Sequence, residues 1–227
     1  MDNRELEKRI GYKFRDSSLL EAALTHPSRS NEDRTLKDNQ RLEFLGDAVI
    51  DLVIGEHLFK RFPDEREGEL TKQRALIVCA DSFYLASRKF DLGEFIYLGK
   101  GEMQSGGKYK KNIIADAFEA LIGAVFLDSS YETAKSIIMK LLADIIKKAE
   151  AGNLTYDYKS QLQEYVHHRK IKDFSYELVK ITGPEHNQLF TSRLLIEGKV
   201  YGTGEGRNKK ESEQHAALEA LKKMGAV

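Results

Sequence analysis

Two apolar segments of this chain each carry a pair of acidic residues: Glu43 and Asp47 in residues 42–50, and Asp116 and Glu119 in residues 113–122. On a helix, spacings of four and three residues place both carboxylates of a pair on one face, about a turn apart. Their neighbours are almost all apolar, so we expect both helices to be largely buried. Buried carboxylates are normally paired with a cation or bound to a metal. The four acids therefore predict a divalent metal site.

Two other interpretations compete with metal binding. Acidic pairs on helices usually lie on solvated faces, but these apolar runs leave little room for such a face. A buried ion pair would need cations, and Arg41 is the only obvious one nearby. Oxygen ligands without His or Cys favour Mg²⁺ or Mn²⁺ over Zn²⁺, and such an ion can activate water and neutralise phosphate oxygens. The acids therefore favour metal-dependent hydrolysis of phosphodiester bonds.

The same two segments contain glycines, Gly46 and Gly123, where a helix is expected. A glycine inside a helix costs about 1 kcal/mol relative to alanine, so each one indicates a packing or access requirement. Asp51 lies on the same stripe as Glu43 and Asp47. We interpret Asp51 as a structural or supporting residue, because nothing pairs it with the second helix.

The segments that must position these acids read as successive helices, with no strand-like alternation of any length before residue 150. The expected helices cover residues 19–24 with Asp16 as a cap, 40–61, 69–78 after Gly68, 81–90, 113–122 after a glycine-rich loop at 101–107, and 137–146 after a capping box at 129–132. This part of the chain is therefore predicted to be all-α.

The pattern changes after a short linker. Helices are expected at 158–168 and 208–224, with three strands between them at 174–181, 188–196 and 199–204. Gly183-Pro184 and Glu197-Gly198 mark the turns. The α-β-β-β-α order predicts a small α+β unit with one antiparallel sheet and both helices on one face. We place the two domains at residues 1–149 and 157–226, joined by a linker at 150–156.

The bulk properties set broad limits on function. The chain of 227 residues has no run of 18 apolar residues, so we expect no membrane span. Its N-terminus is too charged for a secretory signal, and the single Cys79 excludes an internal disulfide framework and a cysteine-based zinc site. These features predict a cytoplasmic protein. The net charge of zero argues neither for nor against a nucleic-acid partner, so a binding surface would have to come from local clustering.

Such a cluster occurs at the start of the last expected helix, where Lys209 and Lys210 fall in the first turn. Cations there oppose the helix dipole, so their placement makes sense if they face an external anion such as phosphate. The adjacent Arg207 favours this interpretation, whereas an isolated lysine pair is usually just solvated. His186 lies in the first inter-strand turn and could reach a groove, although a lone histidine in a turn is more often simply exposed.

Several segments resemble the bacterial ribonuclease III family. Residues 41–48 closely resemble its signature, residues 116–120 match its second acidic motif, and residues 67–71 resemble a third shared segment. The tail resembles a double-stranded RNA-binding domain in residues 157–164, 183–186 and 209–211. The resemblance covers essentially the whole chain, in the domain order of the family.

The resemblance implies a homodimeric endoribonuclease that depends on Mg²⁺, with Mn²⁺ as a substitute and no organic cofactor, and that acts in rRNA and mRNA processing. Each subunit would cut one strand of an RNA duplex, leaving 5′-phosphate and 3′-hydroxyl ends with 3′ overhangs. By resemblance, Glu43, Asp116 and Glu119 bind the metal. Asp47 is implied to act with Glu119 in catalysis, by holding or activating the attacking water.

The same resemblance implies that the tail reads the shape of duplex RNA across the minor groove, with little base specificity. Residues that match minor-groove contacts are Ser160, Gln163, Glu164 and His186. Residues that match phosphate contacts across the major groove are Arg207, Lys209 and Lys210.

One position departs from the family pattern. Gln40 stands where the family commonly has Glu, three residues before Glu43 and therefore near the site or its edge. A neutral amide removes one negative charge, which could weaken a second metal or a water contact. The alternative function is a duplex RNA-binding protein with a nuclease-like domain and no catalysis. The four matching acids favour the enzyme.

Overall fold

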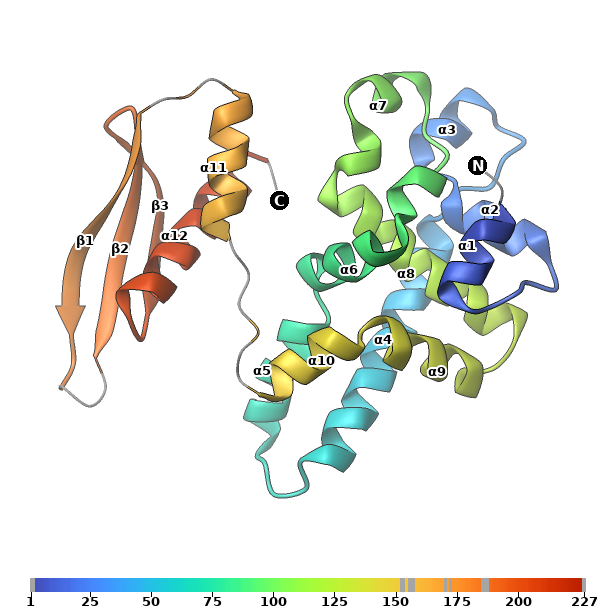
Figure 1. Cartoon of the computed structure of the whole chain (residues 1–227), viewed down its shortest axis with the longest axis horizontal. Coiled ribbons are helices and arrows are strands. Elements are labelled where there is room, and N and C mark those ends of the chain that lie inside the picture. Colours follow the sequence, from blue (N-terminus) through green and yellow to red (C-terminus); the bar gives the residue numbers. More distant parts are fainter. Residues whose placement is uncertain are drawn as a thin grey trace. The chain divides into compact units, whose positions relative to one another are not determined.

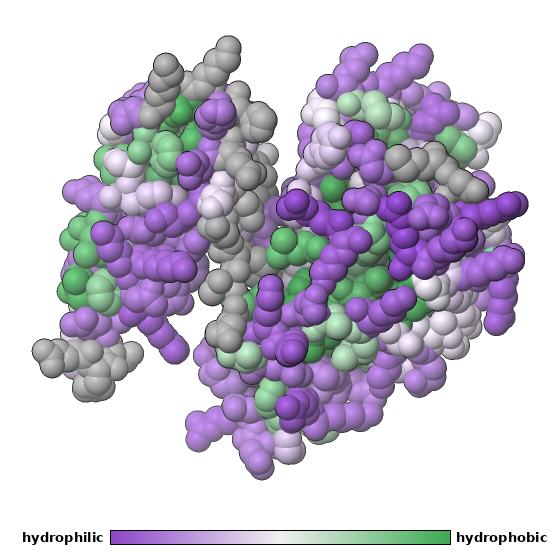
Figure 2. Space-filling model, viewed as in Figure 1, coloured by the Kyte–Doolittle hydropathy of each residue, from purple (hydrophilic) through white to green (hydrophobic). Residues whose placement is uncertain are grey.

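The computed structural model describes residues 3–151, 154, 158–169, 171, 173–184 and 188–225. The chain divides into two compact units, Met1–Leu154 and Thr155–Val227, and each is described by itself (Figure 1). Hydrophilic side chains cover most of the face shown in Figure 2, and apolar side chains reach the surface between them. Within the described residues, the helices are too short or too polar to cross a membrane.

The first unit is built from helices, as predicted, and its described residues form no strand. Its α-helices are α1 Asn3–Ile10, α2 Ser17–Leu24, α3 Pro27–Glu32, α4 Gln40–Arg61, α5 Glu67–Ile77, α6 Ala80–Ser87, α7 Lys100–Gln104, α8 Lys111–Asp128, α9 Tyr131–Leu141 and α10 Ala143–Glu150. Three short 3₁₀ turns join them, η1 Arg88–Phe90, η2 Leu92–Phe95 and η3 Gly107–Tyr109.

Helix α8 forms the centre of this unit and packs against α2, α4 and α6 (Figure 1). Its apolar residues from Ile113 to Val125 are all buried, and the two acids that interrupt this run are partly exposed. Phe118 stacks on Phe83 of α6 with ring centroids 5.1 Å apart, which adds a specific aromatic contact to the burial of apolar area. The acid-bearing helix is therefore held by the core itself.

The sequence located most helix boundaries, because capping residues act locally. Asp16 accepts a hydrogen bond from the Ser18 N–H at the start of α2, as expected. Helix α4 has the predicted bounds, and it ends directly before Phe62-Pro63, since a proline cannot continue the hydrogen-bond ladder. At α9 the cap is Ser130, which accepts from the Thr133 N–H.

Several expectations for this unit were wrong in detail. Helix α5 begins at Glu67, so Gly68 lies in its first turn instead of before it. The glycine-rich segment 101–107 is not simply a loop, because residues 100–104 form α7. The last expected helix is broken at Leu142 into α9 and α10. The short helices α1 and α3 were missed, since a turn or two of polar sequence carries little periodic signal.

The prediction that both acid-bearing helices are buried holds for α8 and is wrong for α4. One side of α4 contacts α8, while Phe44, Leu52 and Phe59 are 80%, 59% and 72% exposed. Asp47 is exposed as well. The apolar run of α4 therefore does not mean that the whole helix is buried. It signals a helix with a core face and a second apolar face that reaches the surface.

The second unit has the predicted α-β-β-β-α order. Its elements are α11 Tyr158–His168, β1 Phe174–Thr182, β2 Leu189–Ile196, β3 Lys199–Gly206 and α12 Lys209–Lys223. The strands form an antiparallel sheet in the order β1-β2-β3, and both helices lie on one face of it (Figure 1). Glu197 and Gly198 join β2 to β3 with positive φ angles of 49° and 72°, as a tight two-residue hairpin turn requires.

Helix α12 lies directly on the backbone of β3. A Cβ atom added to Gly202 would lie 2.1 Å from the Ala216 carbonyl oxygen, and one added to Gly204 would lie 2.2 Å from the Ala216 nitrogen. Glycine at both strand positions is therefore required for this close approach. A buried hydrogen bond of 2.7 Å between the hydroxyls of Ser192 and Ser212 joins the same helix to β2.

Candidate functional site

The acid-bearing helices α4 and α8 cross at their two glycines. A Cβ atom on Gly46 would lie 1.8 Å from the carbonyl oxygen of Glu119, and one on Gly123 would lie 2.2 Å from the carbonyl oxygen of Leu42. Each glycine thus allows the other helix's backbone to approach closer than any side chain would permit. The packing requirement predicted for both positions is confirmed, and it places Glu43 beside the acids of α8.

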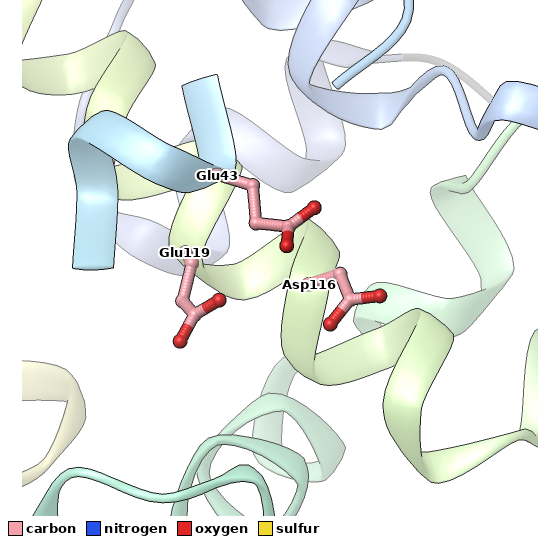
Figure 3. A group of neighbouring side chains, drawn as sticks. All are labelled: Glu43, Asp116 and Glu119. Carbon is pink, nitrogen blue, oxygen red and sulfur yellow. The ribbon is translucent and has the colours of Figure 1, made fainter. Parts of the chain in front are cut away.

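Three of the four acids converge at this crossing. Glu43 on α4 and Asp116 and Glu119 on α8 direct their carboxylates into one space (Figure 3). One oxygen from each lies within 4.8 Å of one from each of the others. Mg²⁺ holds oxygen ligands at about 2.1 Å, so two ligands of one ion lie at most about 4.2 Å apart, and small rotations of these side chains would bring all three oxygens onto a single cation. This is the set that the sequence proposed as metal ligands.

Partial burial raises the pKa of each of these carboxyls, and repulsion from neighbouring carboxylates adds to the rise for Glu43 and Glu119. Burial, followed by the charges of Asp47 and Asp116, raises the pKa of Glu119 from 4.5 to about 8. Burial and the charge of Asp116 raise the pKa of Glu43, and burial raises that of Asp116. Among the described residues, no cation forms an ion pair with any of the three. The donor set therefore fits a hard divalent cation, which would supply the missing positive charge.

The other candidate residues of α4 do not belong to this group of three, and each has different surroundings. Asp47 lies outside the group of three, but its charge raises the pKa of both glutamates in that group. Gln40 is exposed in the first turn, where its backbone N–H donates to Asp38. Asp51 forms an ion pair of 3.6 Å with Arg74 of α5, a partner that local sequence spacing could not reveal.

Backbone hydrogen bonds fix the start of α4 and with it the position of Glu43. The Asn39 N–H donates to the Thr25 carbonyl at 2.9 Å, and residues 24–26 bond in turn to Tyr97. The Glu43 N–H donates to the Asn39 carbonyl at 2.8 Å. Three chain segments that are distant in sequence therefore determine where the first metal-ligand candidate lies.

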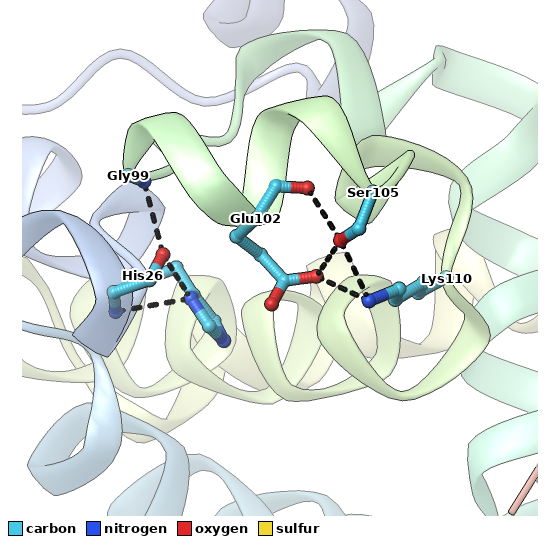
Figure 4. A network of polar contacts seen from close by, with 6 residues as sticks. His26, Gly99, Glu102, Ser105 and Lys110 are labelled. Atoms are coloured by element: carbon cyan, nitrogen blue, oxygen red, sulfur yellow. Dashed lines mark hydrogen bonds and ion pairs between the residues drawn. The ribbon is translucent and has the colours of Figure 1, made fainter.

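A polar network fixes the start of α8 in a similar way (Figure 4). Lys110, the residue before α8, donates to the carboxylate of Glu102 at 2.6 Å and to the Ser105 hydroxyl at 3.0 Å. The Lys110 contact holds the pKa of the Glu102 carboxyl below its usual range. Burial lowers the pKa of the nearby His26, whose ring Nδ1 lies 2.8 Å from the Ser28 hydroxyl. No role was predicted from the sequence for any of these residues.

The next residue, Lys111, makes a second connection. Its ammonium lies 2.9 Å from Asp81 of α6, and both side chains are about nine-tenths buried. The pair ties the first turn of α8 to the first turn of α6. This pair could not be predicted from local spacing, because the partners lie 30 residues apart.

In the second unit, the candidate RNA contacts gather on α11 and at the start of α12. Ser160 and Gln163 are exposed on α11, and Arg207, Lys209 and Lys210 are exposed around the first turn of α12. The side chain of Glu164 and the whole of His186 lie outside the described residues.

Asn208 caps the start of α12. Asn208 accepts from the Glu211 N–H at 2.9 Å, and the Glu211 carboxylate accepts from the Arg207 N–H at 2.7 Å. This reciprocal arrangement satisfies backbone donors that would otherwise be free. It also fixes the backbone from which Lys209 and Lys210 project.

Comparison with known proteins agrees with both halves of this description. A family model described as Ribonuclease-III-like matches residues 16–146, and one described as a double-stranded RNA binding motif matches residues 158–224. The chain is 47% identical over 223 residues to a protein named Ribonuclease 3 from Caldanaerobacter subterraneus subsp. tengcongensis, covering 98% of each chain. It belongs to the ribonuclease III family. A second relative named Ribonuclease 3, from Pelotomaculum thermopropionicum, is 46% identical over 220 residues and covers 96% of this chain and 91% of that protein.

A solved structure shows the same fold for the ribonuclease III unit. The crystal structure of the nuclease domain of the Campylobacter jejuni enzyme is 44% identical in sequence, with a TM-score of 0.59. The match covers 64% of this chain and 97% of that one. Another structure of that domain, described as showing flexibility in a region involved in dimer formation, is 43% identical, has a TM-score of 0.60 and covers 63% and 97% of the two chains.

The crossing predicts opposite effects for two glycine substitutions in α4. We expect Gly46→Ala to destabilise the protein by about 1–3 kcal/mol or more, because its Cβ would overlap the Glu119 carbonyl and force the helices apart. Gly55→Ala is the matched control, since a Cβ there has nothing within 4 Å, and alanine should stabilise the helix by up to about 1 kcal/mol. Chemical denaturation measures both. Equal effects of the two variants would contradict the close crossing.

The raised pKa of Glu119 predicts a pH dependence of stability in the metal-free protein. A carboxyl whose pKa rises on folding contributes stability that is complete below about pH 4.5 and is lost as the pH rises through about 8. We expect Glu119→Gln to remove this loss, gaining about 1–4 kcal/mol over the wild type at pH 9 and little at pH 4.5.

The free energy of unfolding, measured with a chelator across this pH range, tests the effect. The exposed Glu21→Gln provides the control, and its difference from the wild type should not change with pH in this way. A Glu119→Gln gain of the same size at both pH values would contradict the burial of a repelled charge.

Proposed function

We propose that this protein is a divalent-metal-dependent endoribonuclease that hydrolyses phosphodiester bonds in double-stranded RNA. The observation that carries the proposal is the convergence of Glu43, Asp116 and Glu119 in a chain that belongs to the ribonuclease III family. The double-stranded RNA binding motif in the second unit supports the substrate class. The proposed division is a nuclease domain at 1–149, a linker at 150–156 and an RNA-binding domain at 157–226.

We assign the metal to Glu43, Asp116 and Glu119, with Mg²⁺ as the expected ion and Mn²⁺ as a substitute. The bound ion would neutralise phosphate oxygens and lower the pKa of water in the site. Asp47 is exposed one turn from Glu43, so its carboxylate is free to accept a hydrogen bond from the attacking water and to orient it. The water oxygen forms the new bond to phosphorus, and the bond to the 3′ oxygen breaks. A water proton ends on that oxygen, which gives 5′-phosphate and 3′-hydroxyl ends.

The second unit supplies the affinity for the duplex in this proposal. Arg207, Lys209 and Lys210 contact phosphates, and Ser160 and Gln163 on α11 face the minor groove. Phosphate contacts carry little sequence information, so binding should depend on the A-form shape of the RNA. rRNA and mRNA precursors that fold back into duplexes have this shape, and cleavage of such precursors in the cytoplasm is the proposed role.

The rate of RNA cleavage by a variant that lacks one of the three proposed metal ligands tests the assignment directly. We expect Glu119→Ala to lower the rate of duplex cleavage at least about 100-fold, because a repelled, metal-binding carboxylate is removed from the centre of the cluster. Duplex affinity, which the second unit provides, should change little. Glu132→Ala in α9 is the control, since Glu132 is exposed and does not belong to the group of three carboxylates. Gel analysis of a long RNA duplex with Mg²⁺ or Mn²⁺, together with a binding assay, measures both quantities.

Two outcomes would overturn the assignment. A wild-type protein that binds duplex RNA but never cleaves it, with either metal, would favour the duplex-binding protein without catalysis. Equal loss of cleavage and binding in Glu119→Ala would show that the two units do not divide the work as proposed.

We further propose that the nuclease units form a homodimer through the exposed face of α4. Phe44, Ala48, Leu52 and Phe59 are all exposed and lie within about 80° of one another around the helix. A contiguous apolar surface of this kind usually marks an interface. The dimer-forming region described for the Campylobacter jejuni nuclease domain supports the proposal. Two subunits would then present one cluster of acids to each strand of the duplex, which produces staggered cuts and 3′ overhangs.

A charge placed in this apolar stripe should prevent association. We expect Leu52→Lys with Phe59→Lys to shift the protein from twice the chain mass to a single chain, because burying two ammonium groups at an interface costs several kcal/mol. Sedimentation equilibrium measures the mass. Leu189→Lys with Val200→Lys is the control, since it places the same two charges at exposed apolar positions of the other unit. A dimer that survives both α4 substitutions would move the interface elsewhere.

A further inference from the structure

Two consecutive residues of α12 hold the first turn of α11. The Lys159 ammonium donates to the Glu213 carboxylate at 2.6 Å, and the Lys159 backbone N–H donates to the Gln214 side-chain oxygen at 3.0 Å. The Glu213 side chain is only 11% exposed. Both the backbone and the charged end of Lys159 are therefore fixed by α12, at the point where α11 begins.

The same carboxylate also reaches toward the proposed phosphate contacts. Its second oxygen lies 3.9 Å from the ammonium of Lys209, one turn earlier on α12. Lys159 in turn lies over the Tyr176 ring of β1, 4.6 Å from its centroid. Glu213 thus stands between a cation of α11 and a cation of α12, in a cluster that also includes the sheet.

Stability alone is a weak reason for this arrangement. Removing a carboxylate from water has a cost that its ion pairs roughly offset, and an apolar residue at a helix contact often serves as well. A buried, doubly contacted carboxylate does, however, define geometry. The two helices that it joins carry the proposed RNA contacts, Ser160 and Gln163 on α11 and Lys209 and Lys210 on α12.

The geometry matters because an RNA duplex is a rigid partner. The distance from a minor groove to the phosphates across the next major groove is set by the A-form helix. A protein whose contacting helices are held at that distance avoids the entropic cost of ordering them on binding. Conversely, helices that can shift relative to each other must be ordered at the moment of binding.

We propose that Glu213 is a positioning residue for duplex binding, an inference that rests on the proposed RNA-binding role of α11 and α12. Its carboxylate fixes the start of α11 against α12 and restrains Lys209 for contact with phosphate. It does so although it places a negative charge beside the cations that attract RNA.

Removing this carboxylate therefore has two opposite expected effects on the affinity for RNA. A Glu213→Gln variant loses one negative charge, so long-range electrostatics alone predicts tighter binding. Loss of positioning predicts weaker binding. We expect the full-length variant to bind a long RNA duplex about threefold to tenfold more weakly, the range expected when one or two long side chains must be ordered on binding. Binding is measured without divalent cations, so that no cleavage occurs.

Two controls accompany the variant. Glu177→Gln makes the same charge change at an exposed position of β1, and it should leave affinity unchanged or slightly increased. In a Lys159→Gln background, Glu213→Gln should have much less effect, because the contact through which it acts has already been lost. Titration of active protein separates affinity from folding, since partial unfolding lowers the active fraction without changing the dissociation constant of the remainder.

The outcomes distinguish this inference from the proposed function. Lys209→Ala with Lys210→Ala should reduce the salt dependence of binding, with a change in slope of up to about 1.8 for two phosphate contacts on a double strand. If that slope does not change, the phosphate role itself fails. If it changes but Glu213→Gln binds as tightly as the wild type, or more tightly, the positioning role of Glu213 is overturned.

Discussion

The close contact between the backbones of α4 and α8 is the constraint on which the candidate active site depends. Gly46 meets the Glu119 carbonyl, and Gly123 meets the Leu42 carbonyl. Helices separated by ordinary side chains have axes about 8–10 Å apart. A closer crossing brings together residues that flank the contact, and Glu43 and Glu119 are such residues. The convergence of the candidate metal ligands is thus a consequence of two missing side chains.

This geometry works against folding, since it gathers like charges in a partly buried space. The raised pKa of Glu119 expresses that cost. The rest of the unit offsets it by holding α8 at both ends. Lys111 is tied to Asp81 at the start of the helix, and at its end the Asp128 carboxylate accepts from the Tyr12 hydroxyl at 2.6 Å. Between these ends the apolar residues of α8 are buried in the core. The repelled carboxylates therefore lie on a helix that is anchored at both ends and along its length.

The sequence predicted this arrangement as far as local rules extend. Spacing placed the acids on helix faces, and the cost of a mid-helix glycine identified Gly46 and Gly123 as packing positions. Caps and strand patterns located many of the elements, including α4, α11 and the three strands, but not the short helices α1, α3 and α7. Apolar content could not show which side of α4 faces solvent, because that depends on what packs against it. Nor could it show the partner of Asp51, since Arg74 lies in another helix.

Polar networks were the least predictable part of the structure, again because their members lie in different elements. The contact of Glu102 with Lys110, like that of Glu213 with Lys159, joins residues from different elements whose spacing in sequence has no periodic meaning. Each nevertheless fixes the start of a helix that carries candidate functional residues. In both units, then, the groups proposed to touch RNA or metal could be recognised from their types and spacing within single helices, while the groups that orient them come from other elements. Gln40 is exposed at the start of α4. Its neutral amide adds no negative charge near a cluster in which neighbouring carboxylates already raise the pKa of Glu119.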